Sequence, residues 1–282
     1  MRRLKLLVMS LTLPAGLLTA QASPPPSPPR RTFLSGVTAG AAKISDARSE
    51  RAVSAVLAFQ PVHWLTFSTN PSLIRVTDKV TSGTGTVTNT GVGDLPLSVA
   101  VEQELPAPWS PTIGASLDVT LPTGDTAIAI GSGETGAGLN VGVDASPTDK
   151  LNLSVAASRS LAGITSSTLS APGATSLSFD AAVEVAPHWT ASAGFSGDFG
   201  STDTTDTLSR AIAVGVAREL GGGVTLSLDS GFGLSPGSPK WSFSIGIGTA
   251  FTGFSAVGPT SPFARIKRAF GRGVGQGRSH KP

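Results

Sequence analysis

The sequence predicts an all-β fold: an antiparallel transmembrane β-barrel of about twelve strands after a cleaved signal peptide. Three observations predict it: long segments of alternating apolar and small polar residues, connections that alternate between short and long, and a low charge content. Charged residues make up 14% of the 282 residues, against about 25% in ordinary soluble domains. No run of about 20 apolar residues follows the first two dozen positions, which excludes a helical membrane protein.

The first 22 residues have the pattern of a signal peptide. Arg2, Arg3 and Lys5 precede a short apolar stretch over residues 6–18, and Ala20-Gln21-Ala22 forms an A-x-A cleavage site. We therefore expect cleavage after Ala22. A Pro-rich spacer over 23–32 follows, then the barrel over 33–251 and a basic C-terminal tail over 252–282.

Charge is distributed unevenly along the chain. Residues 33–251 hold 10 basic and 18 acidic residues, whereas the tail holds six basic residues and no acid. The basic balance therefore does not indicate nucleic-acid binding by the folded part. The chain has no Cys, which removes disulfides, thiolate metal sites and cysteine nucleophiles from consideration.

Period-two alternation is clearest in the last predicted strand. There, Trp241, Phe243, Ile245, Ile247 and Phe251 share one face. Similar segments of about ten to twelve residues, long enough to cross a bilayer at a tilt, recur before it. Eleven strands are clear, and because an even number is expected, residues 33–42 are the candidate for the twelfth. Ten strands is the alternative.

The connections alternate in length, as short periplasmic turns and longer outer loops do in bacterial barrels. The longer polar loops are predicted at 77–93, 122–133, 161–174 and 199–206, with tight turns between them. Aromatic residues near the short turns predict an interfacial girdle at the periplasmic end, made of Phe59, Trp109, Trp189 and Phe251. Trp64 lies at the same level with the opposite parity, so either a bulge occurs there or this side chain faces the lumen.

If the apolar faces contact lipid, six acidic residues point into the barrel. We predict that they line the lumen, where they would disfavour anions. The alternative is that they are solvated wall residues or partners in internal hydrogen bonds. The six are Glu102, Asp118, Asp144, Asp180, Glu184 and Asp229.

No motif predicts catalysis, a cofactor or a bound metal. Residues 131–136 match G-x-G-x-x-G, but a strand and not a helix is expected to follow, so a loop is the better interpretation. The chain has three His residues and no H-x-x-x-H spacing. It also lacks a G-x-S-x-G elbow, although a barrel with Ser and His on different strands stays conceivable.

Short Gly-rich motifs carry a resemblance to a known family. They are Gly91-Val92-Gly93-Asp94, the stretch 121–125 (LPTGD), Gly131-Ser132-Gly133 and the turn over 145–151 (ASPTDKL). Over roughly 51–251 the chain resembles the outer-membrane transporters of the MetA pathway of phenol degradation. The resemblance implies a barrel of about a dozen strands and a role in the uptake of hydrophobic or aromatic compounds.

The first functional hypothesis is therefore a passive channel or transporter in the outer membrane of a Gram-negative bacterium, with lipid and small hydrophobic solutes as partners. The second is a structural or adhesive surface protein whose lumen is closed. A soluble secreted β-sandwich is a third, which the strand lengths disfavour. The tail is expected to contact anionic lipid or the cell wall, or to be an unstructured basic end.

Overall fold

A computed structural model describes residues 32–79, 85–109, 111–128, 130–162, 175–199, 209–235 and 238–249. These residues form strand segments and one short 3-10 helix, η1 (Thr126–Ile128). No helix among them is long and apolar enough to cross a membrane. The predicted signal peptide, nearly all of the spacer and the C-terminal tail lie outside the described residues. The strands are β1 (Thr32–Lys43), β2 (Arg48–Val62), β3 (Leu65–Thr69), β4 (Ser72–Lys79), β5 (Thr86–Val92), β6 (Leu95–Glu104), β7 (Thr112–Leu121), β8 (Gly136–Thr148), β9 (Leu151–Ala162), β10 (Thr175–Ala186), β11 (Trp189–Phe199), β12 (Arg210–Gly221), β13 (Val224–Gly233) and β14 (Trp241–Gly248).

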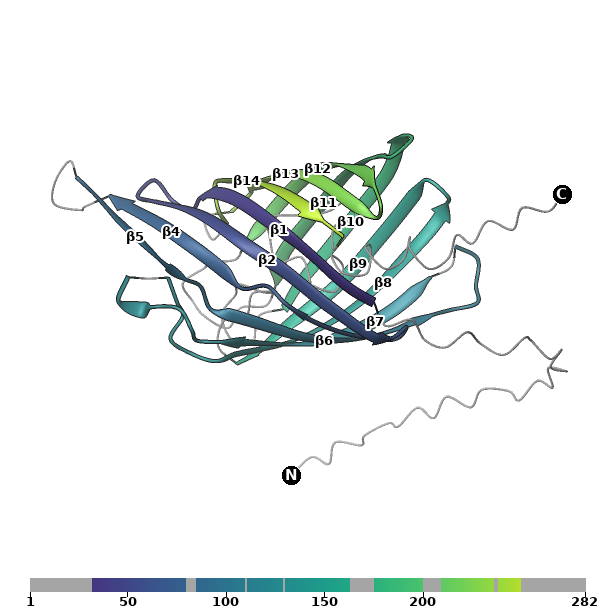
Figure 1. The fold of residues 1–282 in the computed structure, drawn as a ribbon, viewed down its shortest axis with the longest axis horizontal. Helices are drawn as coiled ribbons and strands as arrows, with labels where there is room; N and C mark the ends of the chain where they lie inside the picture. Colours follow the sequence, from purple (N-terminus) through teal and green to yellow (C-terminus); the bar gives the residue numbers. More distant parts are fainter. Residues whose placement is uncertain are drawn as a thin grey trace, which may run out of the picture.

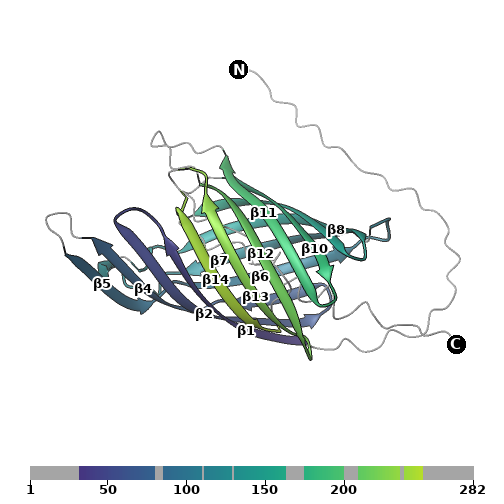
Figure 2. The same ribbon diagram turned by 90° about the horizontal axis from the view of Figure 1, so that it is seen from above.

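The strands form one closed antiparallel barrel (Figures 1 and 2). Neighbours in sequence pair along the wall, and β1 closes it by pairing with both β14 and β2, from Gly36↔Gly248 to Lys43↔Trp241 on the β14 side. Because β1 pairs on both sides, neither β1 nor β14 is left as a sheet edge; among the described strands, β5 pairs only with β4. The predicted all-β barrel is therefore confirmed, and residues 33–42 do form a strand, β1.

Two of the wall strands are each broken into two segments, so fourteen segments make twelve strands. Strands β3 and β4 both pair with β2, on either side of Asn70-Pro71. Across from them, β6 pairs with β3 and β5 pairs with β4, on either side of Gly93-Asp94. Pro71 cannot donate to the ladder, and its carbonyl instead accepts a hydrogen bond from the Ala55 amide.

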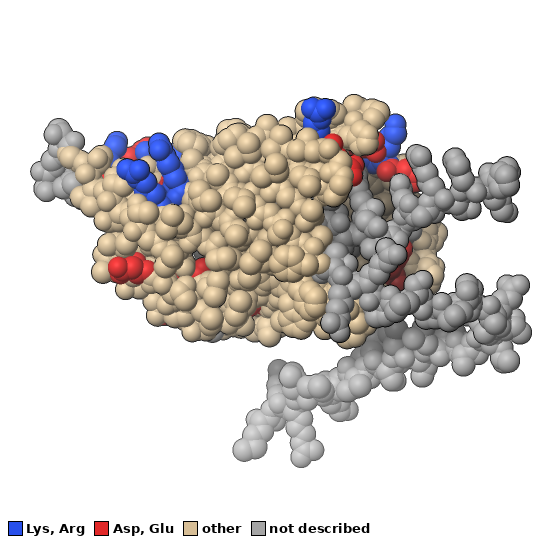
Figure 3. All heavy atoms as spheres, in the orientation of Figure 1, with Lys and Arg blue, Asp and Glu red and all other residues tan. Residues whose placement is uncertain are grey.

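The two faces of the wall differ in size and polarity of side chain. Large apolar residues such as Val53, Leu117 and Ile245 point outward and are 41–51% exposed. Inward positions carry mostly Ser, Thr, Gly, Ala and acidic residues, many of them buried. Since water would not favour an apolar exterior around a polar interior, this arrangement is that of a barrel embedded in lipid. Figure 3 shows a broad outer belt in which uncharged residues predominate.

The connections divide between the two ends of the barrel as predicted, except that one short turn, 44–47, lies at the end with the longer loops. One end has the short turns at 63–64, 149–150, 187–188 and 222–223, together with the connection 105–111 and both ends of the barrel chain. We call it the turn end. The other end, called the outer end, has the hairpin turn 44–47 and the loops 122–135 and 234–240.

Two details of the sequence prediction change. The predicted loop 77–93 is wrong in its bounds, because β4 runs to Lys79 and β5 occupies Thr86–Val92. Trp64 lies in the β2–β3 turn next to a register shift between Phe59 and Val62, so the predicted bulge is the correct alternative. The last strand ends at Gly248, and Phe251 lies outside the described residues.

Candidate functional site

The inner wall of the barrel is the candidate site, because it is where the polar and acidic side chains meet. All six predicted acids have inward parity, on β6, β7, β8, β10 and β13. Glu102 and Glu184 are partly exposed. The four aspartates are nearly covered, with exposed fractions of 2–6%. The structure therefore places the predicted residues on the inner face of the barrel. They are spread over five strands and do not form a single cluster. The buried four are Asp118, Asp144, Asp180 and Asp229.

Asp118 is held by a neighbour on the next strand. Asn140 on β8 donates from Nδ2 to Asp118 Oδ2, and the same group lies 3.2 Å from Ser116 Oγ. All three side chains are buried. The hydrogen bond fixes the Asp118 carboxylate between β7 and β8.

Two other carboxylates lie flat against glycines. A Cβ on Gly194 would stand 2.2 Å from Asp180 Oδ1, and a Cβ on Gly215 would stand 2.5 Å from Asp229 Oδ1. Because the facing residue on the neighbouring strand is a glycine, each of these two carboxylates can lie in the space that a side chain would otherwise fill.

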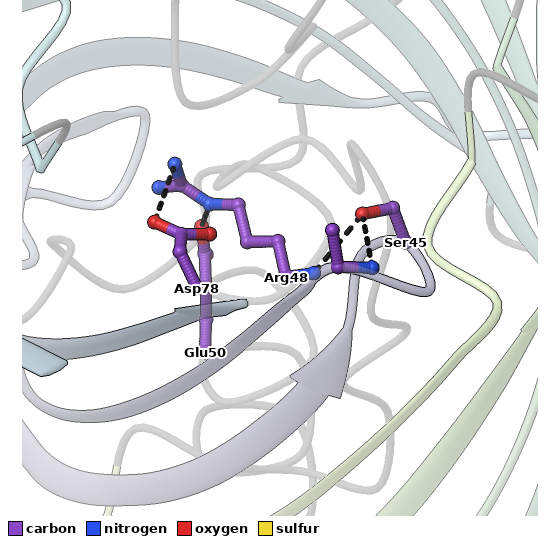
Figure 4. A network of polar contacts seen from close by, with 5 residues as sticks. Ser45, Arg48, Glu50 and Asp78 are labelled. Atoms are coloured by element: carbon purple, nitrogen blue, oxygen red, sulfur yellow. Dashed lines mark hydrogen bonds and ion pairs between the residues drawn. The ribbon is translucent and has the colours of Figure 1, made fainter. Parts of the chain in front are cut away.

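At the outer end an arginine joins the inner wall, and the sequence analysis missed it. Arg48 Nε lies 2.7 Å from Glu50 Oε1, and its guanidinium is 3.9 Å from Asp78 Oδ2 on β4 (Figure 4). The Arg48 amide donates to Ser45 Oγ, which orders the hairpin turn below it. The sequence could have predicted this pair, because Arg48 and Glu50 are both at inward positions in the alternation of β2.

The loop 122–135 folds over the wall near this mouth. A Cβ on Gly91 would meet Ile130 Cδ1 at 3.3 Å and Ile128 Cδ1 at 3.4 Å, and Ile74 on β4 lies next to Gly93. We call Ile74, Ile128 and Ile130 the mouth isoleucines. Together with Val76, the next inward residue on β4, they form an apolar region on an inner wall whose side chains are mostly polar or small. None of them was among the predicted site residues.

Asp94 ties the loop to the wall. One carboxylate oxygen accepts from the Gly124 amide at 2.9 Å, and the other accepts from the Ser132 amide at 2.7 Å. Gly124 and Gly131 lie back to back, so that a Cβ on Gly131 would be 2.4 Å from the Gly124 carbonyl oxygen. The G-x-G-x-x-G stretch is thus part of a closely packed loop, followed by strand β8.

The predicted girdle residues that are described lie at the turn end. Phe59 is near the end of β2, Trp109 is in the 105–111 connection, and Trp189 begins β11. Arg218 stacks over Trp189, with its Cζ 5.2 Å from the ring centroid. Among the described residues, no group of three or more His, Asp or Glu side chains is placed to hold a metal ion.

Comparisons with known proteins agree with this architecture. The model of a family described as "Putative MetA-pathway of phenol degradation" matches residues 39–251. The COG4313 outer membrane channel from Pseudomonas putida F1 is similar in structure, with TM-score 0.60 and 15% identity over 83% of this chain and all of that chain. The KdgM porin is similar at TM-score 0.50 and 7% identity, over 77% of this chain and 98% of that chain. A comparison with curated protein sequences finds no match.

Proposed function

The chain belongs to the family of the MetA pathway of phenol degradation, and on that premise we propose that it is an outer-membrane channel. It would allow passive uptake of small compounds, aromatic or hydrophobic ones among them. The fold, shared with outer-membrane channels, supports a location in the outer membrane of a Gram-negative bacterium.

The observation that carries the proposal is the small size of the inward side chains on half of the wall. From β8 to β14 the inward positions between the turns carry Gly, Ala, Ser, Thr, Asn, Asp or Glu. No aromatic residue and no Leu, Ile or Val has inward parity in these segments. A wall of this kind leaves room for water and small solutes, whereas a purely structural barrel can fill its interior with bulky side chains.

The mouth isoleucines support the choice of solute. A hydrophobic molecule that enters at the outer end would find an apolar contact at Ile128 and Ile130, which lie next to Gly91 on the inner wall. Apolar contacts of this kind stabilise a bound apolar solute by about 25 cal/mol for each Å² removed from water. The family description, which refers to phenol degradation, points to the same class of compound.

Single-channel conductance of the folded protein in a planar bilayer tests the proposal. An open pore should give steady ohmic steps. If the bilayer stays silent while heat-dependent gel migration shows a folded barrel, the protein is better described as a structural or adhesive surface protein with a closed lumen.

A transport assay tests the solute class separately. We expect Ile128→Ser with Ile130→Ser to slow the entry of radiolabelled phenol or toluene into liposomes that contain the channel, with ion conductance unchanged. Ala127→Ser is the matched control, since Ala127 is exposed in the same loop. Equal slowing by the control would argue against a role for the isoleucines.

We propose roles for the remaining predicted residues on the same basis. The six inward acids line the aqueous path, and Phe59, Trp109, Trp189 and Phe251 form an aromatic girdle at the turn end. The tail, residues 252–282, contacts anionic lipid or the cell wall through its six basic residues. Co-sedimentation of the full chain and of a chain lacking 252–282 with anionic vesicles or with peptidoglycan distinguishes the two partners.

A further inference from the structure

Acidic and basic residues of the described strands lie on opposite faces of the wall. All eleven strand acids have inward parity, whereas seven of the eight strand bases have outward parity, Arg48 being the exception. Arg218 is outward at the turn end. The other six outward bases are all near the outer end: Lys43, Arg51, Arg75, Lys79, Arg159 and Arg210.

Two of these bases face each other across neighbouring strands. Arg51 on β2 is the direct Cα partner of Arg75 on β4, and both side chains are exposed. Neither makes an ion pair with any described residue. Like charges placed directly opposite in a sheet repel and destabilise the pair, so this arrangement calls for an anion from outside the chain.

The register fixes the position of the arginine pair along β2 and β4. Immediately toward the turn end is the apolar row Ile245–Ala39–Val53–Leu73–Val92, read from β14 to β5. The arginine pair occupies the next outward row, between Ala41 and Thr90. Beyond it is a row with Lys43 and Trp241. The pair is thus at the boundary where the apolar belt ends and polar residues begin.

Figure 3 shows where the charged side chains begin at this boundary. Lys and Arg side chains gather over the outer ends of β1, β2 and β4, next to the broad uncharged belt. A Trp at the same boundary is typical of a membrane interface. At that height, the groups next to the protein in a bilayer are lipid headgroups, and in anionic lipids these carry phosphate.

We propose that Arg51 and Arg75 form a binding site for the phosphate of an anionic lipid in the outer leaflet, with Lys43 in the next outward row. Guanidinium groups bind phosphate oxygens in a bidentate manner, and two facing guanidiniums can share one phosphate. The lipid's acyl chains would lie along Val53 and Leu73 in the row below. This continuity between phosphate site and apolar belt favours a lipid over free inorganic phosphate.

Native mass spectrometry of the detergent-solubilised full chain tests the site. The protein is equilibrated with equal amounts of phosphatidic acid and phosphatidylcholine, and the occupancy of each lipid is compared. We expect the unmodified protein to retain phosphatidic acid preferentially. In the variant Arg51→Gln with Arg75→Gln, the preference should fall by about fivefold for each guanidinium removed.

Two further variants keep the test decisive. Lys150→Gln with Arg218→Gln removes two positive charges at the turn end and should keep most of the preference. Arg51→Lys with Arg75→Lys keeps the charge and removes the bidentate geometry, so an intermediate preference is expected. Heat-dependent gel migration shows whether each variant is folded. If the glutamine variant does not fold, the lipid preference of the lysine variant is compared with that of the unmodified protein instead.

Three results would overturn the proposal. The glutamine variant could keep the full preference, or the turn-end variant could lose as much, which would reduce the effect to net charge. Inorganic phosphate could also displace the lipid at matched concentration, in which case the site is one for free phosphate. None of these results depends on whether the lumen conducts, so the test is independent of the proposed channel function.

Discussion

Asp180 and Asp229 keep their places on the inner wall because the facing positions are glycines. A methyl group on Gly194 would overlap Asp180 Oδ1, which is the end of a flexible side chain and can rotate away. We therefore expect Gly194→Ala to fold, with the Asp180 carboxylate displaced from its rotamer. A displaced rotamer costs about 0.5–1.5 kcal/mol. The measurement is the free energy of unfolding in urea from lipid vesicles.

A double-mutant cycle shows whether that loss comes from the predicted contact. In the background Asp180→Ala, the substitution at Gly194 should cost little, because no carboxylate remains to be displaced. If Gly194→Ala is equally destabilising with and without Asp180, the loss has another cause and the fit of Asp180 against Gly194 is not responsible.

At the scale of elements, Asp94 joins the break between β5 and β6 to the loop 122–135. Its two oxygens accept from the amides of Gly124 and Ser132, and hydrogen bonds to a charged group are worth about 1.5–3 kcal/mol each. Asp94→Asn keeps the shape, but one of its two terminal atoms becomes a donor and can no longer accept. We expect the loop to open more often and proteinase K to cut it several-fold faster.

The control for the loop is Asp125→Asn. Asp125 is exposed, and its side chain accepts a hydrogen bond from the nearby Ala127 amide in its own loop. Its substitution should leave the cutting rate close to that of the unmodified protein. Equal rates for all three proteins would show that Asp94 does not determine how the loop is held.

The strands that the sequence predicted best are those with apolar outward residues, as in 241–248. The mistaken loop over 77–93 has a physical reason, since the outward positions of β5 include Thr86, Thr88 and Thr90. This part of the hairpin extends beyond the apolar belt, so its outward face is polar and a hydrophobicity pattern does not detect the strand. The broken strands are similar: Pro71 marks one break, but only the pairing shows that β3 and β4 belong to one strand.

At the scale of the whole molecule, the acids of the barrel wall point inward and nearly all of its bases point outward. The sequence predicted the inward acids but not the outward bases. Alternation alone assigned the six acids to the inward face, because parity is a local property. It did not reveal the Arg51–Arg75 pair, whose members are 24 positions apart and meet only through the β2–β4 register. The mouth isoleucines were missed for a related reason, because Ile128 and Ile130 reach the inner wall through the fold of a loop.

The separation of charge predicts the ion preference of the pore. With acids inward and all strand bases but Arg48 outward, the potential inside should be negative, so that cations enter more readily than anions. Reversal potentials in a KCl gradient should show a cation preference that weakens as salt is raised, because the Debye length is about 10 Å at 0.1 M and about 3 Å at 1 M. Replacing Asp118, Asp144, Asp180 and Asp229 together by Asn should reduce the preference.

The outward bases supply the control, since they are charged residues on the opposite face of the same wall. Arg51→Gln with Arg75→Gln changes the net charge of the protein but leaves the inner wall as it is, so the reversal potential should stay where it was. A shift as large as that of the aspartate variant would mean that surface charge at the mouth sets the selectivity. Anion preference in the unmodified channel would contradict the prediction that the ion path is acidic. It would mean that the four aspartates do not influence the ions that pass through the pore.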